Sequence, residues 1–357
     1  MILFTLTIVF AFFIPCKAFS SNVDDNDYND INTLQVCVCV PYWQCKEDFS
    51  GLIEEGVGIV DIRSLLNSNQ SEPPCTGDFD VCCKIECGKR RSIPKAENKN
   101  IGFRIIGADN DATFGEFPWM LGVLQDKTYK CGASLIHPQV AVTAAHCVGG
   151  RRPYKVRAGE WNWLVKDEPL PHQDRITKKV VIHPQYNSGT LSNDIALLVL
   201  REPFKLMENV GVICLPPKHL HLESQNCVAT GWGKNSHKKG SYQTTLKKVT
   251  LPLVPRSICL RSLQEAMLGP SFILHNSFLC AGGVGNKDTC KGDGGSPLIC
   301  PVEGDMGKYQ QVGIVSWGLT CGVINTPGVY VNVLVFRDWI DNVMTGEGFD
   351  TNVYKYY

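Results

Sequence analysis

Three short segments of the sequence carry residue types that could together perform acyl transfer. They are Thr143-Ala144-Ala145-His146-Cys147, Asn193-Asp194-Ile195-Ala196-Leu197-Leu198 and Cys290-Lys291-Gly292-Asp293-Gly294-Gly295-Ser296-Pro297. Acyl transfer by a serine hydrolase needs a hydroxyl nucleophile, an imidazole that takes its proton and a buried carboxylate that orients the imidazole. His146 and Asp194 have the right types for the base and the orienting acid. The question is whether Ser296 can supply the hydroxyl.

These segments resemble, in the same chain order, the catalytic segments of trypsin-like serine proteases. In that family the third segment reads Gly-Asp-Ser-Gly-Gly-Pro, which puts Gly294 in the serine position. Ser296 lies two residues downstream, about 6.5 Å along an extended chain, and a misplacement of about 1 Å can already cost about 100-fold in rate. Loss of the nucleophile costs about 10⁶ in turnover in subtilisin. Backbone N–H groups of Gly292 and Gly294 cannot compensate for that loss, so we expect His146 and Asp194 to be remnants of a triad in a protein that is not an enzyme.

The resemblance also implies a specificity pocket. Asp288 stands six residues before Gly294, where trypsin-like proteases place the acid that binds Arg or Lys. The pocket walls match at Ser316, Gly318 and Gly328. A buried carboxylate prefers a cation to being unpaired, so the pocket could hold a basic side chain without cutting it, or could be an inherited, water-filled acid.

An activation site is implied as well. Phe103-Arg104-Ile105-Ile106-Gly107 resembles the junction at which cleavage after arginine frees an N-terminal isoleucine. The ammonium group of Ile105 would then pair with Asp293, although Ala108 stands where the family usually has a second glycine. Arg63 is a competing cleavage site.

Composition indicates a globular, secreted protein. Of the 357 residues 44% are apolar and 20% are charged, and 35 basic residues balance 35 acidic ones, so charge predicts neither nucleic acid nor a membrane surface as partner. Residues 1–20 form an apolar run typical of a cleaved signal peptide and too short for a membrane anchor. Seventeen cysteines favour an oxidising compartment, and removal of Cys16 with the signal leaves sixteen.

The cysteines divide the chain into modules. Residues 21–36 are rich in Asn and Asp and predict a flexible acidic leader, and residues 37–83 hold six cysteines in a segment too small to rely on a hydrophobic core. This cysteine pattern resembles the clip domain of arthropod proteases, with an unrelated knottin-like module as the alternative. Residues 84–104 are basic and predict an exposed linker.

The resemblance implies eight disulfides, although six cysteines by themselves allow 15 pairings in the first module. In clip-domain proteases a cysteine of the linker is tied to the larger domain, and the other pairs follow the family. The implied bonds are Cys37–Cys82, Cys39–Cys75, Cys45–Cys83, Cys87–Cys214, Cys131–Cys147, Cys227–Cys300, Cys259–Cys280 and Cys290–Cys321. The linker bond Cys87–Cys214 would keep the two modules joined after cleavage.

From residue 105 onward the sequence has the texture of an all-β domain. Short Val-, Ile- and Leu-rich runs are broken by Gly, Pro and Asn, and only residues 333–340 space their apolar side chains as one helical face. The fold class is therefore mainly β, and the resemblance implies a chymotrypsin-like double β-barrel with a C-terminal helix over residues 105–344. Residues 345–357 form a Tyr-rich tail that is either a contact or disordered.

Two further sites are predicted. Asn69-Gln70-Ser71 is an N-glycosylation sequon at Asn69. Glu160 and Glu168 flank a loop that binds calcium in some relatives, which makes calcium the one cofactor to consider, with none required. Zinc is disfavoured because close cysteine pairs with suitably spaced histidines are missing.

The resemblance covers nearly the whole mature chain and is to clip-domain serine protease homologues of arthropods, in particular the group that assists prophenoloxidase activation in melanisation. It implies a secreted haemolymph protein whose partners are an upstream clip-domain serine protease and prophenoloxidase, with self-association left open. One alternative is a pattern-recognition or adhesion protein that binds microbial surfaces, and a second is an active trypsin-like endopeptidase. The role rests on family likeness and not on the chemistry of the site.

Overall fold

The computed structural model describes residues 37–41, 45, 80–84, 86–90, 110–150, 153–222, 225–234, 241–285, 289, 292–305, 307–319 and 323–356, with the backbone alone at 37–41 and 80–84. All of them lie in the compact unit Val36–Tyr357. In the first module, β1 (Cys37–Pro41) pairs with β2 (Asp80–Lys84) in an antiparallel ribbon, in which Cys39 lies opposite Cys82.

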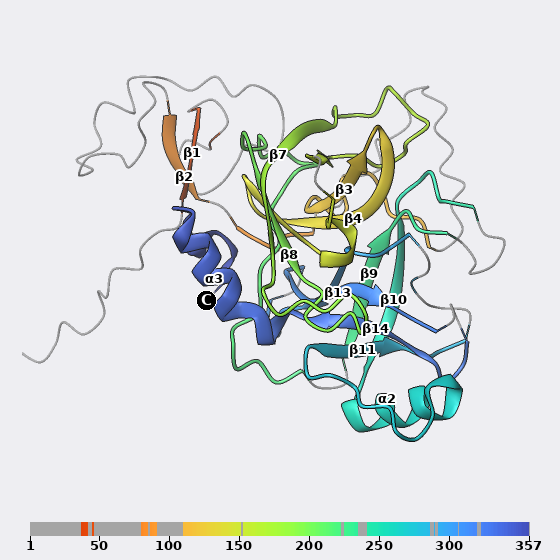
Figure 1. Ribbon diagram of the computed structural model, residues 1–357. Helices are drawn as coiled ribbons and strands as arrows, with labels where there is room; N and C mark the ends of the chain where they lie inside the picture. Colours follow the sequence, from red (N-terminus) through yellow and green to blue (C-terminus); the bar gives the residue numbers. More distant parts are fainter. Residues whose placement is uncertain are drawn as a thin grey trace, which may run out of the picture. The chain divides into compact units, whose positions relative to one another are not determined.

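The rest of the described chain is built on two closed six-stranded barrels (Figure 1). The first has the strand order β3-β4-β5-β8-β7-β6 and consists of β3 (Met120–Gln125), β4 (Thr128–His137), β5 (Val140–Thr143), β6 (Lys155–Ala158), β7 (Gln173–Ile182) and β8 (Ala196–Leu200). The second has the order β10-β11-β14-β13-β12-β9 and consists of β9 (Asn226–Gly231), β10 (Lys247–Val254), β11 (Phe278–Gly282), β12 (Pro297–Pro301), β13 (Tyr309–Trp317) and β14 (Pro327–Asn332). The expected mainly β, double-barrel fold is confirmed.

Buried strands surround the site. Every residue of β5 and β8 is buried, because both faces of these neighbouring strands are covered. β5 leads directly into the turn that carries His146, and the segment with Asp194 leads directly into β8. The barrel core thus fixes the two chain segments that present the imidazole and the carboxylate.

Hydrogen bonds from β4 of the first barrel reach residues of the second half of the domain. The buried Ser134 hydroxyl of β4 donates to Gln311 Oε1 of β13 at 2.5 Å. The amide of Gly132 donates to the carbonyl oxygen of Gly294 at 2.9 Å. Since each bond spans the two barrels, residue 294 is held at a defined place beside the first barrel.

The helices differ in part from the prediction. The C-terminal helix α3 (Arg337–Gly346) begins later than the apolar spacing suggested, because residues Val333–Phe336 form a 3-10 turn. Helix α2 (Arg256–Leu263), followed by the π-helical turn Gln264–Leu268, was not expected. The disulfide from Cys259 to Cys280 of β11 ties this helix to the barrel. Because the helix buries only Cys259 and Leu263, its sequence has little of the amphipathic pattern by which a helix is predicted. Among the described residues, helices are all too short or too polar to cross a membrane.

The start of the linker is docked in part: Cys87 and Gly88 are buried and Arg90 is half-buried, whereas Glu86 and Lys89 are exposed. Cys87 is buried and forms the disulfide with Cys214, while Gly88 exchanges backbone hydrogen bonds with Val212 and Tyr309 at 2.8 and 2.7 Å. Arg90 pairs with the buried carboxylate of Glu116 and donates to the Tyr309 hydroxyl at 3.1 Å. A basic composition predicts exposure, but a disulfide and a buried acid override it here.

The tail is also packed. Residues Thr351–Tyr354 form a 3-10 turn whose Val353 and Tyr354 side chains are buried. The Tyr354 hydroxyl donates to Asp341 at 2.7 Å, and the Leu215 amide donates to the Tyr354 carbonyl at 2.9 Å. The described part of the tail is therefore an intramolecular contact.

His137, at the end of β4, gives the domain a testable pH dependence. Its ring packs 4.8 Å from the ring of Phe349, measured between centroids, and burial lowers the pKa of His137 to about 4. The folded state binds fewer protons than the unfolded chain between about pH 6.5 and pH 4, so this residue's contribution to stability is lost as pH falls through that window. The free energy of unfolding should be measured by denaturant titration at pH 7 and at pH 4. On going from pH 7 to pH 4, the loss of this free energy should be up to about 3 kcal/mol smaller in His137→Gln than in the unmodified protein. Equal losses would contradict this account.

Candidate functional site

His146 is presented by a single rigid turn. Residues Ala145–Cys147 form a 3-10 turn after β5, and the side chains of Ala145 and Cys147 on either side of the histidine are buried. The His146 side chain keeps 29% of its exposure. The turn thus buries its flanks in the first barrel and leaves the imidazole at the surface of the site.

Asp194 holds this imidazole from a fully buried position. Its Oδ1 accepts a hydrogen bond from the His146 amide at 2.8 Å, and its Oδ2 lies 2.7 Å from His146 Nδ1. The hydroxyl of Ser316, on β13 of the second barrel, donates to the same Oδ2 at 2.6 Å. Because Asp194 engages Nδ1, Nε2 is the ring nitrogen left facing the site.

Gly294 stands where this Nε2 points. A Cβ atom added to Gly294 would lie 2.7 Å from His146 Nε2 and 3.2 Å from Cε1. The distance of 2.7 Å is a steric clash, so the imidazole occupies space that a serine side chain at residue 294 would need. The site combines an oriented imidazole with the absence of a hydroxyl at residue 294.

Ser296 lies away from the imidazole, in the interior. It is 0% exposed, and its hydroxyl points at Gly132, whose missing side chain makes the room for it. Its amide donates to the Asp293 carbonyl at 2.9 Å. In this position the Ser296 hydroxyl faces neither solvent nor His146.

Asp293 is buried next to two glycines. The amide of Gly233 donates to its Oδ1 at 2.8 Å. A side chain on Gly231 or Gly233 would collide with this carboxylate, so both glycines are needed for the position of Asp293. Arg104 and Ile105, the expected activation residues, lie outside the described residues, as does the alternative cleavage site Arg63.

An aromatic cluster covers the loop ahead of Gly294, and sequence reasoning missed it. The Tyr129 hydroxyl donates to the Gly292 carbonyl at 3.2 Å, and burial, together with the negative charge of Asp293, raises the pKa of Tyr129 well above its ordinary value. Tyr242 packs against Gly292, whose φ of +101° favours glycine. Trp232 makes edge-to-face contacts with Tyr129 and Trp163, and Trp163 packs against Tyr129 at a tilted angle. These residues are distant in sequence, and no spacing signal connects them.

The remaining pocket residues are only partly described. Ser316, taken as a pocket wall, uses its hydroxyl to support Asp194, a role that the sequence did not indicate. Gly318 is exposed, and Gly328 pairs with Ala281 in the second barrel. Asp288 lies outside the described residues.

Four disulfides are formed among the described residues, and each is among the eight pairs that the resemblance implied. They are Cys87–Cys214, Cys131–Cys147, Cys227–Cys300 and Cys259–Cys280. The pairs Cys37–Cys82, Cys39–Cys75, Cys45–Cys83 and Cys290–Cys321, and the sequon at Asn69, involve residues outside the described side chains.

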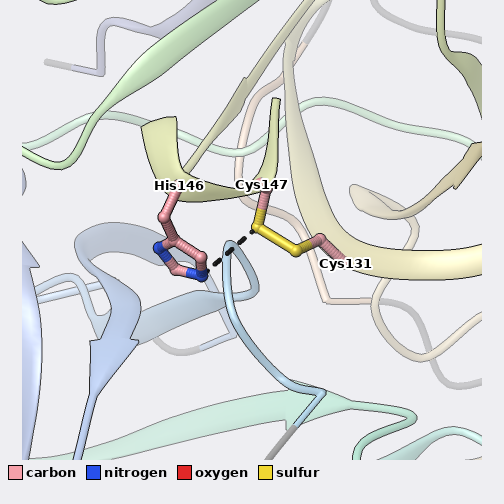
Figure 2. A group of neighbouring side chains, drawn as sticks. All are labelled: Cys131, His146 and Cys147. Carbon is pink, nitrogen blue, oxygen red and sulfur yellow. Dashed lines mark hydrogen bonds between the residues drawn. A yellow bond between two sulfur atoms is a disulfide. The ribbon is translucent and has the colours of Figure 1, made fainter. Parts of the chain in front are cut away.

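One of these disulfides adjoins the imidazole (Figure 2). His146 Nε2 lies 3.6 Å from Cys147 Sγ, and the donor atoms of Cys131, His146 and Cys147 all lie within 4.8 Å of one another. The two sulfur atoms are bonded to each other and are not thiolates. This group is therefore not a zinc site, since zinc takes cysteine as thiolate.

Glu160 and Glu168 meet at a second, separate cluster. Glu160 Oε2 accepts from Arg157 at 3.1 Å, and Glu168 Oε1 accepts from the amides of Trp161 and Asn162 at 3.2 and 2.7 Å. The other oxygens, Glu160 Oε1 and Glu168 Oε2, are buried without a hydrogen-bond partner among the described residues. Burial and the charge of Glu160 raise the pKa of Glu168 to about 7. Two facing, under-satisfied carboxylates fit a hard cation such as Ca²⁺.

Comparison with known proteins matches both modules. A family model described as Trypsin matches residues 105–340, and one described as Serine protease Clip domain PPAF-2 matches residues 26–84. Phenoloxidase-activating factor 2 of Galleria mellonella is 49% identical over 276 residues, which cover 72% of this chain and 91% of that protein.

Two mosquito relatives are similar over comparable lengths. The Inactive CLIP domain-containing serine protease A28 of Anopheles gambiae is 43% identical over 77% of this chain and 73% of its own length. The Inactive CLIP domain-containing serine protease A3 of Aedes aegypti is 35% identical over 88% of this chain and 68% of its own. With two barrels, an aspartate-held histidine and a glycine at the nucleophile position, the chain belongs to the clip-domain members of the trypsin family.

Proposed function

We propose that this protein is a secreted, non-catalytic serine protease homologue that acts as a binding cofactor in a proteolytic innate-immune cascade, and that it assists prophenoloxidase activation. The observation that carries the proposal is the geometry at Gly294, where the hydroxyl is missing and His146 Nε2 lies 2.7 Å from the place of a Cβ atom. Ser296 is buried against Gly132 and offers no substitute. A fold that keeps its barrels and disulfides without a nucleophile supports a function through binding.

The relatives supply the direction of this proposal. One similar protein is named a phenoloxidase-activating factor and several are named inactive CLIP domain-containing proteases. For this chain we propose haemolymph as the location, cleavage after Arg104 by an upstream clip-domain serine protease, and prophenoloxidase as the downstream partner. The new terminus at Ile105 would pair with Asp293, which already accepts from the Gly233 amide.

Catalytic inactivity is tested by restoring the hydroxyl. The purified, processed protein should neither hydrolyse an arginine chromogenic substrate nor be labelled by a serine-directed phosphonate. Gly294→Ser should remain at least about 100-fold less active than a trypsin assayed in parallel, because the imidazole has to move before a serine fits and small misplacements are costly. Phosphonate labelling of the unmodified protein at Ser296 would establish an active protease instead.

The cofactor role is tested by reconstitution. Prophenoloxidase and its activating protease are incubated with and without this protein, and phenoloxidase activity is measured. We expect a gain that is abolished by Arg104→Gln and kept by Arg63→Gln, with Ile105 as the new N-terminus by sequencing. No gain with the cleaved protein would refute the cofactor role, and retention of microbial cell-wall glycans in the same preparation would then favour a pattern-recognition protein. Loss of the gain in Arg63→Gln alone would move the processing site into the clip domain.

We also propose that the Glu160 and Glu168 cluster binds calcium as a structural ion. The carboxylates would hold the cation and relieve two buried, unpartnered oxygens. Calcium at about 100 times its dissociation constant should stabilise the protein by about 2.7 kcal/mol, measured as a rise in the thermal unfolding midpoint that is reversed by chelator.

Two variants make that measurement specific. Glu168→Gln should abolish the calcium-dependent rise, whereas Glu202→Gln, which removes an exposed carboxylate of the same type, should leave it unchanged. A rise of equal size in both variants would show that calcium binds elsewhere. An equal rise with magnesium would speak against a calcium site, because Mg²⁺ demands a stricter geometry.

A further inference from the structure

The imidazole of His146 has lost its hydroxyl partner and faces sulfur. Its Nδ1 is engaged by Asp194 at 2.7 Å, so Nε2 is the nitrogen free to give or take a proton at the site. The contact that the structure gives Nε2 is with Cys147 Sγ, at 3.6 Å (Figure 2). A proton carried on Nε2 would therefore be placed next to the disulfide.

The same glycine also lies beside the partner sulfur. A Cβ atom on Gly294 would lie 3.8 Å from Cys131 Sγ, in van der Waals contact, so a side chain at this position would cover that sulfur. Cys131 keeps 6% exposure and Cys147 keeps none. Of the two cysteines, Cys131 thus keeps the greater exposure.

Together these contacts have the parts of a thiol–disulfide exchange centre. Exchange begins when a thiolate attacks one sulfur, and it is faster when the leaving sulfur is stabilised as it acquires charge. Here Cys131 is the less buried of the two cysteines, and the leaving sulfur, Cys147 Sγ, has the imidazole Nε2 3.6 Å away.

We propose that the Cys131–Cys147 disulfide is a modification site for small thiols, with His146 as the acid that protonates the leaving sulfur. The thiolate of a low-molecular-weight thiol forms a bond to Cys131 Sγ as the Cys131–Cys147 bond breaks. The electron pair of the broken bond goes to Cys147 Sγ, which takes the proton from protonated His146 Nε2. The products are a mixed disulfide at Cys131, a thiol at Cys147 and a neutral imidazole.

The other described disulfides provide a contrast within the same molecule. Cys227 and Cys300 are both 0% exposed, and Cys227 Sγ faces the carbonyl oxygen of Gln225 at 3.9 Å. Cys87 Sγ faces the carbonyl oxygen of Lys355 at 3.5 Å. Carbonyl oxygens cannot donate a proton to a leaving thiolate, so these bonds lack the feature that we assign to Cys131–Cys147.

The test is the exchange rate of each disulfide in the full-length protein. Reduced glutathione or 2-mercaptoethanol is added under native conditions, free thiols are alkylated at set times, and peptides are quantified by mass spectrometry. Cys131–Cys147 should react at least about tenfold faster than Cys227–Cys300, with the added thiol on Cys131 and the alkyl group on Cys147. Reaction no faster than at Cys227–Cys300, or with the added thiol on Cys147, would overturn the proposal.

Variants identify the cause. His146→Gln should slow the reaction at least about tenfold, and Gly294→Ser should slow it because its side chain covers Cys131. Gly149→Ser is the matched control, because a Cβ atom at Gly149 meets nothing within 4 Å, and it should leave the rate unchanged. Unchanged rates in both His146→Gln and Gly294→Ser would refute the roles assigned here. A variant that merely loosens the fold would also raise the exchange rate of Cys227–Cys300. That rate therefore distinguishes a loosened fold from a specific effect at Cys131–Cys147.

Thiol exchange at Cys131–Cys147 requires glycine at residue 294. It does not require the protein to take part in prophenoloxidase activation. Reconstitution and thiol exchange are measured separately, so either can fail while the other stands.

Discussion

The buried carboxylate of Asp194 is the constraint on which the site depends. It accepts from the amide and the imidazole of His146 in the first barrel and from Ser316 in the second, and it has no exposure to water. A buried charge that loses a partner costs about 3–5 kcal/mol. The histidine and the serine are therefore needed by the aspartate for structural reasons, whether or not any chemistry takes place, which explains how most of a triad can persist beside Gly294.

The rest of the site is arranged around small residues. Gly132 makes room for Ser296, Gly231 and Gly233 make room for Asp293, and Gly294 leaves space that the imidazole enters. Gly294 is the one that stands in the nucleophile position of this family. A single missing side chain removes the nucleophile, and the imidazole that remains lies 3.6 Å from a disulfide sulfur.

Much of this arrangement could be predicted from the sequence because local motifs carry it. The segments around His146, Asp194 and Gly294 each contain their own signal, the short apolar runs broken by glycines indicated a mainly β domain, and the family resemblance implied the two barrels. What could not be predicted depends on contacts between distant segments. Helix α2 rests on one disulfide and two buried side chains, and the aromatic cluster at Tyr129 joins four separate loops and strands. The docking of Arg90 on Glu116 overrides a composition that is typical of exposed linkers.

The bond between Cys87 and Cys214 affects how any processing of this protein can be observed. It joins the segment before residue 91 to the domain that follows residue 109, across every peptide bond between them. A cut in that interval adds one water molecule and separates nothing. Electrophoresis without a reducing agent would show intact and processed chains at nearly the same mobility, and only a reduced sample would display the two fragments.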